Sequence, residues 1–404
     1  ADDFGEPCEV SRTSERLRPN CVRLCTEVVA VSCIRYGSVA RVLLPATFVT
    51  VTLCIPGELS GQVIQLRDPR PVVRIEPTTA GGDSVVFGTI VGATRLSDGT
   101  IVVADPLTPA ILYFDRSARL LSVTGRRGGG PGEFGRIRWI GQCARDTVFA
   151  FEQARIQVFT NRGKVVRTID AGGHLPGQLF CTRSGVIAAV GAGDWSVPGA
   201  PGVRRVRAQA WTFGTDGRLR REIGTIPVTD AAWDGGVWQP TPLGRQMFLS
   251  FDGADLIMGD GESATLASFS PSGTWKTGPS LGAIAARKPT DDDVDAGILA
   301  LLALAPNRQS RAIHDIFARL PRPDAMPPYH RVMADGAGRV WVQLSVVGTA
   351  PTRLRWVDRK TGRTGDLTIA AALVLQEVGP DYLLALEELP SGEQRVVEYA
   401  LIER

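Results

Sequence analysis

Short runs of branched and aromatic residues alternate with glycine-containing turns along most of this 404-residue chain. Such runs occupy residues 101–104, 111–114, 147–151, 156–160, 338–344 and 353–357. Between them lie turns such as Asp98-Gly99, Asp216-Gly217 and Asp335-Gly336, built from residues that tolerate positive φ. Turns every 8–12 residues or so, with almost no helical periodicity, predict an all-β sandwich, barrel or propeller.

A repeat decides among these three architectures. Residues 95–125 hold four short strands and three turns, and residues 136–170 repeat that order. The pattern returns in 178–224, 245–280 and 330–370. A four-stranded repeat of roughly forty residues is typical of a β-propeller.

The last repeat, 371–404, has only three strands. We expect Pro71–Glu76 to add its missing outer strand, because a ring closed by both ends of the chain leaves no exposed sheet edge. Residues 62–404 are therefore predicted to form a six-bladed β-propeller with four-stranded blades, its last blade closed by an N-terminal strand.

One stretch breaks the β pattern. Acidic residues 291–293 precede Ile298, Leu301 and Leu302 at helical spacing, and a second such run ends at Pro321. This predicts a helical hairpin at about 290–320, inserted before the fifth blade. It either caps an apolar patch of the propeller or forms a lid over a ligand.

Residues 1–61 form an extension with a signal-like segment. Val39–Cys54 is apolar apart from Arg41, and about sixteen residues is short for a membrane span but suits a signal-peptide core. The alternative is a buried strand; a lipid anchor on Cys54 is disfavoured by the large Leu53 before it. We expect export to the periplasm, cell envelope or medium, with no membrane span in the mature chain.

Composition is ordinary for a soluble protein, at 44% hydrophobic and 22% charged residues. The net charge of +3 is spread over 45 basic and 42 acidic side chains without a long basic run, so nucleic acid is not an expected partner. With three histidines in the chain, a His-rich metal centre is not predicted. We expect a monomer.

The loop Gly125–Phe134 holds five glycines and a proline, which excludes a regular element. Its Gly-x-Gly-Pro-Gly-Glu-Phe part, Gly128–Phe134, follows a repeat with a Phe114-Asp115 turn. This combination resembles the secreted bacterial six-bladed β-propellers related to NHL repeats, over about residues 62–404. The resemblance implies fold and export, and no particular activity. We expect Glu133 to accept backbone amides and Phe134 to fill the gap between two blades.

In a propeller, connections between blades and between the second and third strands of a blade emerge on one face. The loop at Gly125, the segments 170–174, 191–206 and 224–244, and the helical hairpin would all lie there. Function is more often carried by such loops than by tight turns. The candidate binding residues on that face are Arg126, Arg127, Glu133, His174, Asp194, Trp195, Trp233, Asp234 and Trp238.

Each candidate has a simpler alternative. The tryptophans could recognise a peptide, a sugar or a partner surface, or they could pack the loops down. Arg126 and Arg127 could bind an anion or form a solvated turn. Asp105 and Glu152 recur after the second strands of blades one and two, where they could help to bind calcium. We favour turn caps for these two acids.

No catalytic residues are predicted, because no Gly-x-Ser-x-Gly motif, paired nucleophile and base, or phosphate-binding loop is present. Cys143 and Cys181 end the first strands of adjacent blades, and we expect them to form a disulfide in an oxidising compartment. Cys21 and Cys25 lack the second pair that a zinc site needs.

The sequence favours an exported module that binds a small molecule, a peptide or an envelope protein through the face with the long insertions. The first alternative is a calcium-dependent hydrolase or lyase of the lactonase-like propeller type. The second is a structural component of the cell envelope.

Overall fold

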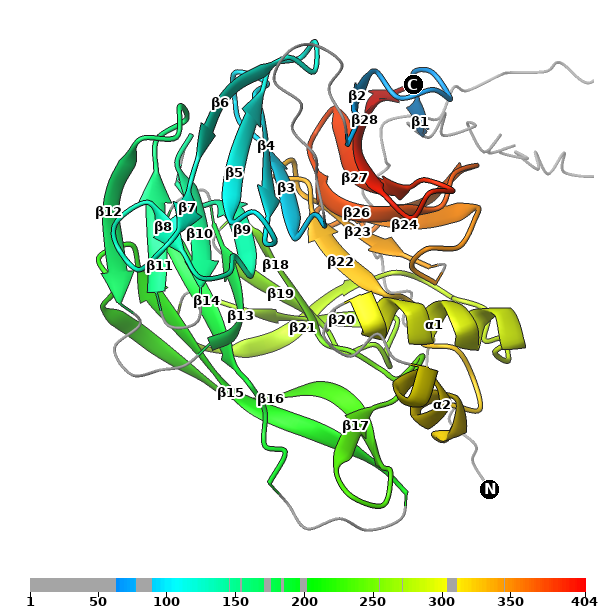
Figure 1. Ribbon diagram of the computed structural model, residues 1–404. Helices are drawn as coiled ribbons and strands as arrows, with labels where there is room; N and C mark the ends of the chain where they lie inside the picture. The colour runs from blue at the N-terminus through cyan, green and yellow to red at the C-terminus, as the bar shows by residue number, and fades with distance from the viewer. Residues whose placement is uncertain are drawn as a thin grey trace, which may run out of the picture. The chain divides into compact units, whose positions relative to one another are not determined.

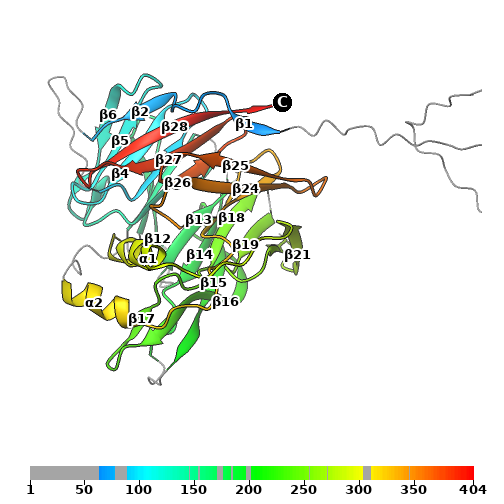
Figure 2. The ribbon, with the colours of Figure 1, turned by 90° about the vertical axis from the view of Figure 1, so that its right-hand side faces the viewer.

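The computed structural model contains six small antiparallel sheets, which are the blades of a β-propeller (Figures 1 and 2). The structure describes residues 63–404 except 78–88, 145, 153–154, 171–175, 183–184, 197–201, 254, 271, 304–310 and 345. The signal-like segment and the rest of residues 1–61 lie outside the described residues. Gln62–Arg404 forms a single unit.

Five blades are continuous in sequence, and each begins at its innermost strand. Blade 1 contains β3 (Gly92–Arg95), β4 (Ile101–Asp105), β5 (Ala110–Phe114) and β6 (Leu120–Thr124). Blade 2 contains β9 (Trp139–Gln142), β10 (Val148–Glu152), β11 (Arg155–Phe159) and β12 (Val165–Asp170). The loop between them holds the short parallel pair β7 (Arg126–Arg127) and β8 (Glu133–Phe134).

Blade 3 is the largest and has five strands, β13 (Pro176–Cys181), β14 (Val186–Gly191), β15 (Val203–Gly214), β16 (Leu219–Trp233) and β17 (Trp238–Pro240). Blade 4 contains β18 (Phe248–Asp252), β19 (Asp255–Gly259), β20 (Thr265–Phe269) and β21 (Trp275–Ser280). Blade 5 contains β22 (Arg331–Ala334), β23 (Arg339–Gln343), β24 (Thr352–Asp358) and β25 (Thr364–Ile369).

Blade 6 joins the two ends of the propeller unit. Its inner strands are β26 (Leu373–Val378), β27 (Tyr382–Glu388) and β28 (Gln394–Glu403). The outer edge of β28 pairs with β2 (Val73–Ile75), as predicted for 71–76, and also with β1 (Ile64–Leu66), which was not predicted. The innermost strands contact one another in the cyclic order β3, β9, β13, β18, β22, β26 and back to β3, so the ring is closed.

The hydrophobic core is divided into clusters that lie between neighbouring blades. Between blades 6 and 1, for example, Ile75 and Leu384 pack with Ile101 and Phe114, and all four residues are 0% exposed. Five further clusters fill the other gaps between blades. Because each gap is filled from both sides, every blade depends on its two neighbours.

The helical hairpin is present as predicted. It comprises α1 (Asp291–Ala303) and α2 (Arg311–Arg319), between β21 and β22. Thr290 caps α1, because its hydroxyl accepts the amide of Asp293 at 3.2 Å while the Asp293 carboxylate accepts the amide of Thr290 at 2.8 Å.

The closing role of β2 can be tested with Ile75→Ala. Ile75 is fully buried between blades 6 and 1, so the truncation should lower the free energy of unfolding by roughly 2–5 kcal/mol. Urea unfolding followed by tryptophan fluorescence measures this. Val72→Ala is the control, since Val72 is 51% exposed just before the same strand and should change stability little. Equal effects of the two substitutions would contradict the closing role of β2.

Candidate functional site

Two insertions stand out on the face where blades are joined, here called the insertion face. The first is an extended part of blade 3, in which β15 and β16 remain paired from Gln209–Thr225 to Val203–Ala232 and β17 adds a third strand. We call this extension the ribbon; in both views it reaches beyond the other blades (Figures 1 and 2). Sequence reasoning placed loops at 191–206 and 224–244, and this was wrong for the paired residues.

The second insertion is the helical hairpin, which packs against the ribbon. Ile298 and Phe317 share an apolar cluster with Ala232 of β16 and Leu243 after β17. Val346, between β23 and β24 of blade 5, belongs to the same cluster. The hairpin therefore covers an apolar patch made by blades 3 and 5, which is the first of the two roles that the sequence left open.

Aromatic side chains gather at the free end of the ribbon. Trp233 and Trp238 are register partners, and their rings meet edge to face with centroids 5.6 Å apart. The Arg204 guanidinium lies over the Trp238 ring, 4.4 Å from its centroid, and donates to the Asp194 carbonyl oxygen at 2.6 Å. We call this end of the ribbon, with Trp195, Val203 and Val237, the ribbon tip.

The turn at the ribbon tip is held by Asp234. Its carboxylate accepts the amides of Gly236 and Val237, both at 2.8 Å, and the side-chain amide of Gln239 at 3.0 Å. These bonds, the one to Val237 first, hold the pKa of Asp234 below its usual range. Asp234 thus fixes the turn, while Val203, Val237 and Trp195 remain 50%, 55% and 36% exposed.

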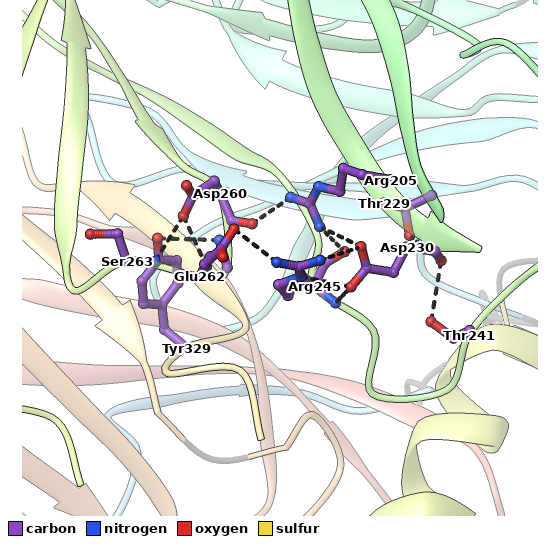
Figure 3. A network of polar contacts seen from close by, with 10 residues as sticks. Arg205, Thr229, Asp230, Thr241, Arg245, Asp260, Glu262, Ser263 and Tyr329 are labelled. Atoms are coloured by element: carbon purple, nitrogen blue, oxygen red, sulfur yellow. Dashed lines mark hydrogen bonds and ion pairs between the residues drawn. The ribbon is translucent and has the colours of Figure 1, made fainter. Parts of the chain in front are cut away.

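A polar network anchors the outer half of the ribbon to blade 4 (Figure 3). The Asp230 carboxylate on β16 accepts Arg205 of β15 at 3.3 Å and Nε of Arg245 at 2.8 Å. Arg205 also donates to the carbonyl oxygens of Arg245, at 2.7 Å, and of Asp260. Arg245 forms a further ion pair with Glu262 at 2.8 Å. The ribbon is thereby tied to the connection between β19 and β20.

Tyr329, just before β22, extends the network to blade 5. Its hydroxyl accepts the amide of Gly261 at 3.3 Å, and burial raises the pKa of the phenol. The network therefore spans three successive blades on the insertion face. Sequence reasoning missed it, because its members come from separate stretches of the chain, at 205, 230–245, 260–262 and 329, and none belongs to a motif.

The residues predicted in the loop at Gly125 serve the loop itself. Glu133 accepts the amide of Gly130 at 2.9 Å and Nε of Arg126 at 2.8 Å, and these two bonds lower the pKa of its carboxyl. Phe134 is fully buried between blades 1 and 2, with its ring centroid 5.9 Å from that of Phe159. Arg127 is exposed. His174 lies outside the described residues.

Asp105 holds a local turn, as expected, whereas Glu152 holds the chain that follows β8, sixteen and seventeen residues away. Asp105 accepts the amide of Leu107 and the hydroxyl of Thr108, both at 2.8 Å. Glu152 accepts the amides of Gly135 and Arg136 and pairs with Arg155 at 3.0 Å. Among the described residues, no three His, Cys, Asp or Glu side chains come close enough together to hold a metal ion.

Cys143 and Cys181 form a disulfide that links blades 2 and 3, with 5.3 Å between their Cα atoms. Beside it, the amide of Ala144 donates to the Thr182 carbonyl oxygen at 3.2 Å. This link lies on the face opposite the ribbon, so Cys143 and Cys181 contribute to the ring and not to the insertion face.

His330 lies between the helical hairpin and blade 5. Its backbone amide donates to the Gln343 carbonyl oxygen at 2.8 Å, and its buried Nε2 has no hydrogen-bond partner among the described residues. Burial first, and then the nearby Arg287, lower the pKa of the imidazole to about 4 against an opposing effect of Asp293. Arg287 and Asp293 are themselves joined at 2.7 Å beside the start of α1.

The fold and the ribbon define the class as a six-bladed β-propeller with one elaborated face. Comparison with solved structures agrees on the fold: a candidate exported protein of Bacteroides fragilis is 11% identical, with a TM-score of 0.50, over 85% of this chain and 96% of that one. A DUF4221 family member from Bacteroides vulgatus is 9% identical, with a TM-score of 0.44, over 85% and 97% of the two chains.

Virginiamycin B lyase from Staphylococcus aureus is 10% identical, with a TM-score of 0.40, over 84% of this chain and 99% of that one. No family model and no curated protein matches the sequence. At 11% identity, the match to the Bacteroides fragilis protein supports the propeller fold alone. Within the described residues, neither helix is long and apolar enough to cross a membrane.

The anchoring role of Asp230 can be tested with Asp230→Asn. Loss of the charge removes the shared partner of Arg205 and Arg245, so backbone amides of the ribbon should exchange hydrogen about tenfold faster or more. Hydrogen exchange with mass spectrometry measures this for each segment. The control Asp216→Asn changes an exposed acid at the other end of the same hairpin. Unchanged ribbon exchange in Asp230→Asn would contradict the anchoring role.

The low pKa of His330 predicts acid sensitivity. The unfolded chain takes up a proton near pH 6.5 and the folded chain only near pH 4, so stability should fall as the pH decreases from about 6.5 towards 4. We expect a smaller loss for His330→Gln over that window. The melting temperatures of both proteins are measured at several pH values. The difference between the two proteins at each pH reports His330, because the carboxyl groups contribute equally to both. Identical profiles would show that His330 is not the cause.

Proposed function

We propose that this protein is an exported β-propeller that binds a protein partner through the ribbon tip. The observation that carries the proposal is the exposure of Val203, Val237 and Trp195 at the end of an extension that the rest of the chain holds in place. Exposed apolar groups beside tryptophan and arginine are typical of the centres of protein interfaces.

The ribbon tip is ordered before any partner binds, which favours affinity. Asp234 fixes the turn, Arg204 is held between Trp238 and the Asp194 carbonyl oxygen, and the Trp195 indole donates to the Ala192 carbonyl oxygen at 2.8 Å. Binding would therefore cost little side-chain entropy at these positions. The same contacts show that the tryptophans also pack the ribbon tip, so the two roles considered for them are compatible.

Two observations support export. The disulfide between Cys143 and Cys181 suits an oxidising compartment, and the apolar segment Val39–Cys54 has the length of a signal-peptide core. For the calcium-dependent hydrolase or lyase, no specific observation among the described residues provides support, since Asp105 accepts bonds from its own turn and Glu152 from the backbone after β8. No observation singles out a purely structural envelope role either.

The proposal is tested in two steps. A photo-crosslinking amino acid at Val203 should capture one discrete partner in cells that export the protein, and mass spectrometry identifies it. With the purified partner, Val237→Asp should weaken binding by about tenfold or more, because it places a charge in an apolar contact. Val237 is 55% exposed, so folding should be unaffected.

Leu121→Asp is the matched control. Leu121 is 48% exposed on β6, the outermost strand of blade 1, and its substitution should leave the affinity unchanged. Equal affinities of Val237→Asp and the unsubstituted protein would overturn the ribbon tip as the binding surface. So would the absence of a discrete crosslinked partner at Val203.

A further inference from the structure

Arg331 begins the innermost strand of blade 5, at the end of that strand which lies on the insertion face. Its side chain is partly buried, and within the described part of the chain it has no hydrogen-bond or ion-pair partner. Burial alone lowers the pKa of the guanidinium to about 10, and no nearby charged group contributes to the shift. The group therefore stays protonated at neutral pH without a counter-charge.

Gln343 is the direct register partner of Arg331 on the neighbouring strand β23. Directly opposite side chains project from the same side of a sheet, so the two side chains are neighbours. Gln343 is fully buried, and its Nε2 donates to the carbonyl oxygen of Leu373, which begins the innermost strand of blade 6, at 3.2 Å. Its Oε1 is buried and has no partner among the described residues.

An unpaired cation and an unpaired acceptor thus lie side by side where the inner ends of blades 5 and 6 meet. The buried Gln343 oxygen costs stability, because a polar group removed from water needs a compensating partner, and the partly buried Arg331 guanidinium loses part of its hydration without gaining an ion-pair partner. Such groups in a native structure call for an explanation, and a ligand that supplies the missing partners is one. The guanidinium needs a negatively charged acceptor, and the Gln343 oxygen needs a hydrogen-bond donor.

We propose that Arg331 and Gln343 form a binding site for a small oxyanion that carries a hydroxyl group next to its charge. The anionic oxygens would accept from the Arg331 guanidinium, and the hydroxyl would donate to Oε1 of Gln343. A hydroxycarboxylate and a protonated phosphate both have this chemistry. A metal cation does not, because Arg331 would repel it.

The site is separate from the ribbon tip. Arg331 and Gln343 belong to blade 5, whereas Val203, Trp233 and Val237 belong to the extension of blade 3. Failure of one proposal therefore leaves the other standing, and Val237→Asp should not change the response to anions.

The first test measures the melting temperature with acetate, glycolate or inorganic phosphate at tens of millimolar. Ligand binding to the folded state raises the melting temperature. We expect glycolate or phosphate to raise the melting temperature more than acetate, because acetate lacks the hydroxyl group. The larger shift of the two identifies the ligand class as a hydroxycarboxylate or a phosphate. Arg331→Met should weaken binding by about tenfold or more, and Gln343→Leu should remove the preference over acetate.

The control is Arg74→Met, which removes the same charge from an exposed position on β2. It should leave the response to all three anions unchanged. A response of Arg331→Met equal to that of the unsubstituted protein would overturn the site. The absence of any response to the three anions in the unsubstituted protein would do the same.

The second test needs no ligand. If Arg331 is retained for binding, Arg331→Met should melt at the same temperature as the unsubstituted protein or higher in a buffer free of small anions, because the substitution removes a partly buried charge that has no ion-pair partner. A lower melting temperature would show that Arg331 stabilises the fold, and would overturn the proposal.

Discussion

Each blade of this propeller is a small sheet with two apolar faces, and neither face can be buried within the blade itself. Burial comes only from the neighbouring blades, so the structure depends on an unbroken ring. The ring is closed at β28, whose outer edge pairs with β1 and β2 from the other end of the propeller unit. Ile75 then packs, fully buried, in the gap between blades 6 and 1, as core side chains do between blades that follow each other in the sequence.

A closed ring also determines where the chain can be elaborated. The turns opposite the insertion face are tight, and there the disulfide of Cys143 and Cys181 joins two blades. Extra length on the insertion face does not disturb the strand pairing, because it lies beyond the strand ends. A long extension still needs support, and Asp230 provides it by taking bonds from Arg205 and Arg245 together. The helical hairpin adds an apolar contact at Ala232.

The blades could be predicted from the sequence, because strand alternation and turn residues are local signals. The turn at 161–163 shows this: Gly163 has a φ of 81°, which glycine adopts without strain. The ribbon could not be predicted in the same way. Residues 224–232 contain glycine and proline, which local rules assign to a loop, but pairing with 203–210 makes them a strand. The pairing of β1 was missed for a similar reason, since three residues carry too little pattern.

The candidate sites divide along the same line. Asp234 and Trp238 could be found from the sequence because acids and tryptophans in long loops are conspicuous there. Arg331 could not, because the sequence holds many arginines and gives no sign of which ones are paired. The structure shows that buried or partly buried arginines in this protein usually have acidic partners. Arg359 contacts Asp252 and Asp255, both at 2.7 Å, and Arg339 pairs with Asp335.

Against that background Arg331 is an exception that packing does not explain. A partly buried arginine kept only for stability would be expected to have an acid beside it, as Arg339 and Arg359 do. The Oε1 atom of its neighbour Gln343 lacks a hydrogen-bond donor, whereas the Arg331 guanidinium lacks an acceptor. Arg331 and Gln343 lie directly opposite each other, at the end of the inner strand that opens on the insertion face. A hydroxylated anion bound there would supply the acceptor that Arg331 lacks and the donor that Gln343 lacks.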